Sequence, residues 1–324
     1  MTDYDCLCLG VIVVDHLCTP IPRMPRPGEL VLARDLPLSI GGLAANAAID
    51  LAKQDYRVAI AGAIGQDLFG DFALQTLAAA NVQTAPLRRL PDVATSGTLI
   101  LNIEGEDRRF IHTRGANALV KADDLPANLP ASCRVLYIGG FLLMPELERQ
   151  DQFRQHLQKL RQQGVKIVLD VVVPGTGNAG ELAYWPSFEH ILPVVDYFLP
   201  NSDEAELITG LTDPAAQAEK FLSAGAGTVV ITLGAQGTYA ASRSERLRGG
   251  CYPMEYVGGT GSGDAFDAGF IAGLLRGEDL RGCIRWGSVL GASCVRALSA
   301  TDGVFTRVEA EEFLARHELP LTNC

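Results

Sequence analysis

The sequence predicts an α/β fold built on a doubly wound parallel sheet, with a small antiparallel β lid beside it. Short apolar runs rich in Val, Ile and Leu alternate with longer amphipathic stretches as far as about residue 310, which is the pattern of successive βαβ units. No linker or low-complexity segment interrupts this alternation, so we expect residues 1–324 to form one domain. Two stretches, at about 16–40 and 96–114, break the rhythm and predict the lid.

The main sheet and its helices follow from these runs in chain order. The apolar runs predict buried strands at Cys6–Val14, Val58–Ile64, Val135–Gly139, Lys166–Val172, Tyr197–Leu199 and Thr228–Leu233. The amphipathic stretches predict helices at Ala44–Lys53, Phe69–Ala80, Glu146–Gln163, Asp203–Thr209, Asp213–Ser223, Asp264–Arg276 and Leu280–Leu298. A parallel sheet of this kind binds ligands beyond the carboxyl ends of its strands, so we expect the site there.

The lid is predicted from two irregular stretches. Pro20–Ile40 carries five prolines among alternating residues, whereas Gly97–Thr113 has the pattern of a hairpin with its turn at Glu104–Asp107. A sheet this small does not stay exposed on one face unless it covers a ligand or pairs with a second subunit. We therefore expect a homodimer formed through the lid.

Charge and composition narrow the classes of function. Lys and Arg total 27 against 38 Asp and Glu, and the formal net charge of -11 disfavours binding to nucleic acid or to an anionic membrane. The eight cysteines form no Cys-x-x-Cys pair, and without a leader or a membrane-spanning apolar stretch the expected location is the cytoplasm. An anionic nucleotide would be held by local devices such as helix N-termini, backbone amides, a metal ion or a few arginines.

The segment Tyr256–Phe270 carries the strongest chemical signal, because four glycines precede an aspartate that opens an apolar helix. Gly261 and Gly263 allow backbone amides to approach a phosphate closely, and the helix dipole adds roughly half a positive charge. A carboxylate at Asp264 would be repelled by a phosphate unless it had another task, and removing the proton of an attacking hydroxyl is such a task. Taken alone, the loop fits a glycine-rich turn with a capping aspartate equally well.

This loop resembles the C-terminal signature Asp-Thr-x-Gly-Ala-Gly-Asp of the ribokinase-like, or PfkB, family of small-molecule kinases, which aligns with Gly258–Asp264. The resemblance implies a ribokinase-like fold with Asp264 as the catalytic base. It also implies that the amides of Gly261, Ser262 and Gly263 stabilise charge on the transferred phosphoryl group.

A second match lies nearer the N-terminus. Gly41, Gly42 and Asn46 resemble the Gly-Gly-x-x-x-Asn sugar-binding turn of the family, in which glycines permit close approach and the amide donates and accepts hydrogen bonds. Asp15 ends the first predicted strand, where family members place an acceptor for a substrate hydroxyl. Helix packing through small residues and an ordinary turn aspartate are the alternatives.

Two further motifs resemble the nucleotide side of the family's site. Asn201 and Glu204 match the Asn-x-x-Glu motif that helps to position the magnesium bound to ATP, although they also fit a helix capping box. Thr232, Gly234 and Gly237 match the Thr-x-Gly-x-x-Gly turn near the ATP phosphates and ribose, and a hairpin turn is the alternative. ATP and Mg²⁺ are the implied cofactors, and no residue is assigned as a direct metal ligand.

The chain departs from the family signature at Gly258 and Gly259, where Asp-Thr is usual. Because that aspartate commonly helps to form a monovalent-cation site, we expect no potassium activation. Arg108, Arg109 and Arg114 cluster on or after the lid hairpin and would suit the carboxylate of a sugar acid or the phosphate of a sugar phosphate. Solvated lid charge explains them equally well.

The motifs together predict an ATP-dependent phosphotransferase that moves the γ-phosphoryl group of Mg-ATP to a hydroxyl of a sugar or sugar derivative. One alternative is a nucleoside kinase of the adenosine type, for which the lid offers little aromatic surface beyond Phe110. The other is a sugar- or nucleotide-binding sensor without catalysis, and the presence of Asp264 argues against it.

Overall fold

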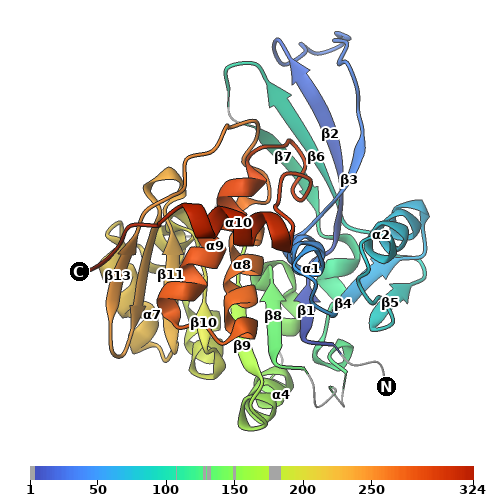
Figure 1. The fold of residues 1–324 in the computed structure, drawn as a ribbon. Helices are drawn as coiled ribbons and strands as arrows, with labels where there is room; N and C mark the ends of the chain where they lie inside the picture. Colours follow the sequence, from blue (N-terminus) through green and yellow to red (C-terminus); the bar gives the residue numbers. More distant parts are fainter. Residues whose placement is uncertain (1–3, 107, 127–128, 130–132, 149–150, 175–183) are drawn as a thin grey trace.

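The computed structural model describes residues 4–106, 108–126, 129, 133–148, 151–174 and 184–324, which form two β-sheets and the helices around them (Figure 1). In the ten-stranded sheet, neighbouring strands from one edge to the interior run parallel. These are β5 (Leu87–Leu90), β4 (Val58–Gly65), β1 (Cys6–Gly10), β8 (Val135–Gly139), β9 (Lys166–Asp170), β10 (Tyr197–Phe198) and β11 (Thr228–Thr232). The other edge is antiparallel and consists of β12 (Thr238–Ser242), β13 (Arg246–Gly249) and β14 (Leu321–Asn323).

Helices cover both faces of this sheet, which confirms the doubly wound prediction. One face packs against α1 (Leu43–Lys53), α2 (Leu68–Ala79), α8 (Ser262–Arg276), α9 (Leu280–Cys294) and α10 (Arg307–Arg316). The other packs against α3 (Pro145–Glu148), α4 (Asp151–Gln162), α5 (Trp185–Ile191), α6 (Ser202–Thr209) and α7 (Pro214–Ser223). The described residues also form short 3-10 helices, namely η1 (Gly115–Leu119), η2 (Ala122–Asp124), η3 (Phe141–Leu143), η4 (Leu192–Val194) and η5 (Gly234–Gln236). The period of two in a strand explains the division, because Cys6 and Cys8 of β1 face the first set of helices and Leu7 and Leu9 the second.

All six predicted strands are present in the parallel part of the sheet, but the first is shorter than predicted. It ends at Gly10, where a Cβ atom would lie 2.1 Å from the carbonyl oxygen of Gly139, so only glycine allows this close approach to β8. The chain then leaves the main sheet and continues in the second one. Within the predicted helix at Glu146–Gln163 the described residues form α3 and α4, and residues 149–150 lie outside the described part of the chain.

The four-stranded sheet has the order β3-β2-β6-β7 and extends away from the ten-stranded sheet (Figure 1). Its strands are β2 (Val13–Ile21), β3 (Leu38–Gly41), β6 (Gly97–Ile103) and β7 (Arg109–Thr113). The pairs β2–β3 and β6–β7 are antiparallel, as predicted, whereas the central pair β2–β6 is parallel. The central pair differs because the chain passes through the main sheet between β3 and β6, so β6 enters the small sheet from the same end as β2. We use the name lid for this sheet and its loops.

The cysteines are free, and six of the eight are buried: Cys6, Cys8, Cys18, Cys133, Cys283 and Cys294. Among the described residues, no helix has the length and apolarity needed to cross a membrane.

Candidate active site

A cavity of about 770 Å³ lies at the carboxyl ends of the parallel strands, between the main sheet and the lid. This is the edge of the sheet at which the sequence placed the site. Most of the predicted site residues line it, namely Asp15, Gly42, Asn46, Asn201, Glu204, Thr232, Gly261, Ser262, Gly263 and Asp264. Gly41, Gly234 and Gly237 are not among the described residues that line it.

The turn before α8 depends on Gly261. Its φ of 81° lies in the left-handed region, and a Cβ atom there would lie 2.4 Å from the carbonyl oxygen of Ala300. Only glycine therefore fits without moving the turn. Ser262 and Gly263 follow as the first helical residues, whose amide groups have no acceptor within the helix, and both residues line the cavity. The Ser262 amide donates a long hydrogen bond of 3.4 Å to the carbonyl oxygen of Gly259.

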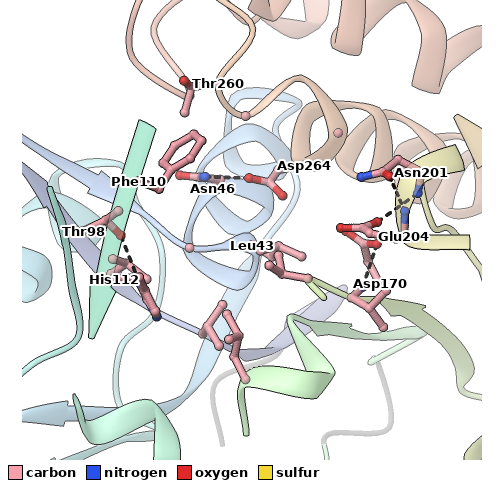
Figure 2. A pocket seen from close by; sticks show the side chains of 18 of the residues that line it. Leu43, Asn46, Thr98, Phe110, His112, Asp170, Asn201, Glu204, Thr260 and Asp264 are labelled. Carbon is pink, nitrogen blue, oxygen red and sulfur yellow. Dashed lines mark hydrogen bonds between the residues drawn. The ribbon is translucent and has the colours of Figure 1, made fainter. Parts of the chain in front are cut away.

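Asp264 lies in the first turn of α8 and meets Asn46 of α1 across the cavity (Figure 2). The Nδ2 group of Asn46 donates a hydrogen bond of 2.6 Å to Oδ2 of Asp264. Desolvation raises the pKa of Asp264 to about 6, the hydrogen bond from Asn46 opposes the rise, and the charge of Asp15 adds to it. Asp264 is therefore ionised at neutral pH but accepts a proton more readily than an exposed carboxylate.

Asp15 is part of a row of side chains across the lid. Asp15 of β2 lies opposite Thr98 of β6, which lies opposite His112 of β7. Burial raises the pKa of Asp15 to about 6, and a hydrogen bond from Thr98 opposes the rise. The Thr98 hydroxyl and His112 Nδ1 are 3.1 Å apart. The donor of this hydrogen bond depends on the tautomer of His112.

The two glycines of the predicted sugar-binding turn have different surroundings. A Cβ atom on Gly41 would lie 2.0 Å from Oδ2 of Asp15. Gly41 is not part of the cavity lining, and its lack of a side chain leaves room for the Asp15 carboxylate, which is. Gly42 has a φ of 90° at the N-cap of α1 and faces the cavity. The Gly-Gly pair therefore positions Asp15 and the start of α1.

The start of α6 shows the capping box that the sequence offered as one interpretation of Asn201 and Glu204. The Oδ1 atom of Asn201 accepts from the Glu204 amide at 2.9 Å, and Oε2 of Glu204 accepts from the Asn201 amide at 3.0 Å. This is a capping box, and both residues also line the cavity (Figure 2). Thr232 ends the adjacent strand β11.

Gly234 and Gly237 lie in the turn between β11 and β12 and are not among the described residues that line the cavity. Gly237 has a φ of 87°, and a Cβ atom there would lie 2.1 Å from the carbonyl oxygen of Gly249. The hairpin alternative given for these two glycines therefore accounts for their positions.

Two buried carboxyl groups, Asp170 and Asp267, also line the cavity, and neither was among the predicted site residues. Tyr137 Oη donates to Oδ2 of Asp267 at 2.8 Å, and the Val171 amide donates to Oδ1 of Asp170 at 2.7 Å. Burial, together with the negative charge of Asp267, raises the pKa of Asp170 well above its usual range. Asp267 follows Asp264 by three residues and so shares its helix face, which is the signal that could have identified it.

The described residues that line the cavity include more acidic than basic side chains. Its lining has five carboxyl groups, on Asp15, Asp170, Glu204, Asp264 and Asp267, whereas among the described lining residues the guanidinium groups are those of Arg108 and Arg114. Arg109, the third arginine of the predicted cluster, points elsewhere and pairs with Glu106 at the surface. A bound polyphosphate would therefore need positive charge from helix N-termini, arginine and a metal ion.

Comparisons with known proteins agree with the geometry. Residues 6–307 match the model of the pfkB family of carbohydrate kinases. The ribokinase of Haemophilus influenzae is 27% identical over 317 residues, which cover 94% of this chain and 97% of that protein. The 2-dehydro-3-deoxygluconokinase of Bacillus subtilis is 27% identical over 280 residues, which cover 85% of this chain and 86% of that protein.

A solved structure shares the fold. A ribokinase II of E. coli, in complex with ATP and Mg²⁺, superposes with a TM-score of 0.78 at 22% sequence identity, covering 97% of this chain and 100% of that chain. Because the family model spans residues 6–307 of the 324, the chain belongs to the pfkB family of carbohydrate kinases.

Proposed function

We propose that this kinase transfers the γ-phosphoryl group of Mg-ATP to a hydroxyl group of a sugar or sugar derivative, with Asp264 as the base. The supporting observation is that the Asp264 carboxylate, at the N-terminus of α8, shares one cavity with Asp15, Asn46 and the glycine-rich turn. With a pKa of about 6, Asp264 is ionised at neutral pH and accepts the hydroxyl proton as the acceptor oxygen attacks phosphorus.

Asn46 and Asp15 would hold the acceptor. Asn46 uses Nδ2 to orient Asp264, and its Oδ1 atom is buried without a hydrogen-bond partner among the described residues. A buried amide oxygen in this state is destabilising unless a ligand donates to it, and a sugar hydroxyl is a suitable donor. Asp15 accepts a hydrogen bond from a second hydroxyl and so fixes the orientation of the sugar.

The start of α8 and the start of α6 would hold the nucleotide. The amides of Ser262 and Gly263 face the developing charge on the transferred group. The capping box uses Oε2 of Glu204, which leaves Oε1 to accept from a water of hydrated Mg²⁺, a hard ion that prefers oxygen ligands and keeps several waters. Mg²⁺ bound to ATP would neutralise charge on its β- and γ-phosphates.

An ADP-release assay over four acceptor classes tests this proposal. D-Ribose, 2-dehydro-3-deoxy-D-gluconate, fructose 6-phosphate and adenosine represent a neutral sugar, a sugar acid, a sugar phosphate and a nucleoside. We expect acceptor-dependent ADP release that disappears when Mg²⁺ is omitted. Release with adenosine alone would identify a nucleoside kinase, and binding of ligands without any release would identify a sensor.

Activation by potassium is not expected, because Gly258 has no side chain to bind a cation beside the turn. The position is also crowded, since a Cβ atom on Gly258 would lie 3.0 Å from the carbonyl oxygen of Ala297. We predict equal turnover in sodium and potassium chloride at matched ionic strength, measured by ADP release. A strong requirement for potassium would show that other groups form a cation site here.

We also propose that the chain forms a homodimer through the lid. Leu30 and Leu32, in the segment between β2 and β3, are 79% and 83% exposed, which is unusual for large apolar side chains that lie close together. Leu32→Glu should convert the dimer to a monomer in light scattering coupled to size exclusion. The control Val308→Glu, at an exposed position on α10, should leave the mass unchanged. A wild-type protein that is monomeric at micromolar concentration would contradict the proposal.

A further inference from the structure

We propose that Arg108 is a further catalytic residue, which binds the phosphoryl group in transit from the lid side of the cavity. The inference rests on the proposed function, because it assigns a role within the same transfer reaction. In this assignment, positive charge at the reacting group comes from a residue outside the glycine-rich turn.

Arg108 directly precedes β7 and continues the alternation of that strand. Arg108, Phe110, His112 and Arg114 all line it, at a spacing of two residues, as expected for one face of a strand. Arg109 lies on the other face, where it pairs with Glu106. The two neighbouring arginines therefore lie on different sides of the lid, Arg108 at the cavity and Arg109 at the surface.

The guanidinium group of Arg108 reaches the loop that precedes the phosphate-binding turn. A Cβ atom on Gly259 would lie 3.3 Å from Nη1 of Arg108 and 3.2 Å from the hydroxyl oxygen of Tyr256. Both distances are tighter than ordinary carbon contacts, so the missing side chain at 259 leaves room for the guanidinium. This contact gives a structural reason for one of the two glycines that depart from the family signature.

A second observation places the charge of Arg108 at the same loop. The Cys294 thiol lies behind the turn and donates to the carbonyl oxygen of Thr260 at 3.3 Å. Burial raises the pKa of this thiol, and the charge of Arg108 is among those that oppose the rise. Figure 2 shows Thr260 and Phe110, a neighbour of Arg108 on β7, on the same side of the cavity as the Asn46–Asp264 pair. The Phe110 ring lies 5.6 Å from the guanidinium carbon and supports it.

The charge of the cavity explains why such a cation is needed. Phosphoryl transfer spreads negative charge over the equatorial oxygens of the group in transit, and the lining contains five carboxyl groups. Arg114 is six residues further along the chain, a span of about 20 Å in an extended strand, so the two arginines do not bind one phosphoryl group together. Arg108 is the arginine that borders the turn, and its fork of N–H donors matches two phosphoryl oxygens.

The step balances without any further reactant. A bond forms between the acceptor oxygen and the γ-phosphorus, and the bond from that phosphorus to the β,γ-bridging oxygen breaks. The electron pair of the broken bond leaves with ADP, and the acceptor proton passes to Asp264. Arg108 keeps its proton throughout and donates hydrogen bonds to the equatorial oxygens.

Arg108→Ala, Arg108→Lys and the control Arg109→Ala test the assignment. The assay uses ATP and whichever of the four acceptors gives the highest kcat/KM with the wild type. For Arg108→Ala we expect kcat to fall by about 10²- to 10³-fold, because one preorganised donor to the transition state is lost. Binding of ATP and acceptor, measured by calorimetry, should be nearly unchanged, and Arg108→Lys should retain intermediate activity. Arg109→Ala should behave as the wild type.

Chemical rescue separates this role from a structural one. Guanidinium chloride at low millimolar concentration should restore part of the kcat of Arg108→Ala and should not accelerate Arg109→Ala. A kcat within about threefold of the wild type, with a raised KM for the acceptor alone, would overturn the assignment and place Arg108 on the acceptor. A wild type that releases no ADP with any acceptor would instead contradict the proposed function itself.

Gly259→Ala provides a test that keeps the arginine. The added methyl should displace the guanidinium and lower kcat, while Gly250→Ala, whose nearest neighbour atom would lie 3.4 Å away at Pro320, should have no effect. This pair decides the question if Arg108→Ala does not fold. An unchanged kcat in Gly259→Ala would then count against the proposal.

Discussion

Replacing Asp264 with asparagine should lower kcat by about 10²- to 10⁴-fold while ATP and the acceptor still bind, because general-base catalysis contributes a factor of this size. The asparagine has the same shape and still accepts a hydrogen bond from Asn46, but it does not take up the acceptor proton. Turnover is measured by ADP release and binding by calorimetry. Glu309→Gln is the matched control, because Glu309 is also the third residue of a helix, α10, and lies outside the cavity.

The pH profile provides a second readout for the same residue. Below its pKa of about 6 Asp264 is protonated and inactive as a base, so kcat/KM of the wild type should fall as the pH drops below 6 and level off above it. Asp15 titrates near the same pH, so the acid limb should be steeper than expected for one group. Near-normal turnover in Asp264→Asn, or a flat wild-type profile down to pH 5, would show that another group accepts the proton.

Gly261→Ala should cause the other large loss. A methyl group there would lie 2.4 Å from the carbonyl oxygen of Ala300 and would force the turn, with the amides of Ser262 and Gly263, out of position. Loss of a preorganised donor lowers kcat by about 10²- to 10³-fold. The left-handed φ of 81° adds a cost of about 1–2 kcal/mol to the free energy of folding. Turnover and the free energy of unfolding are both measured.

Gly277→Ala is the matched control for this change. Gly277 ends the same helix with the same φ of 81°, but no atom would lie within 4 Å of the new methyl group. Gly277→Ala should therefore show the backbone cost alone, with normal kcat. Equal kcat in the two variants would mean that the turn before α8 does not stabilise the transferred group.

In the parallel sheet, the strands buried on both faces could be predicted as apolar runs. In β1, β4 and β8 every residue is buried, so each is a continuous apolar run in the sequence. Edge strand β5, with the sequence Leu-Arg-Arg-Leu, has no such signal, because Arg88 and Arg89 are satisfied by ion pairs with Asp124 and Asp71 that form only in the folded chain. The parallel pairing of β2 with β6 likewise depends on the path of the chain between them.

The same distinction applies to the site. Asp264, Asn46 and Gly261 lie within short motifs, so the spacing of residues in the sequence was enough to predict them as site residues. Thr98 and His112 enter the cavity through the register of β2, β6 and β7, which no local pattern specifies. Gly234 and Gly237 form the turn between β11 and β12 and are not among the described residues that line the cavity, so their role toward a nucleotide stays a prediction.

Phosphorus NMR of a complete reaction tests the central claim most directly. The wild type is incubated with Mg-ATP and each of the four acceptors in turn, and all phosphorus products are quantified. We predict that one acceptor gives a new sugar phosphate ester and ADP in equal amounts, and that Asp264→Asn gives neither at the same enzyme concentration. Formation of ADP with inorganic phosphate in place of an ester, or equal ester formation by both proteins, would contradict the account.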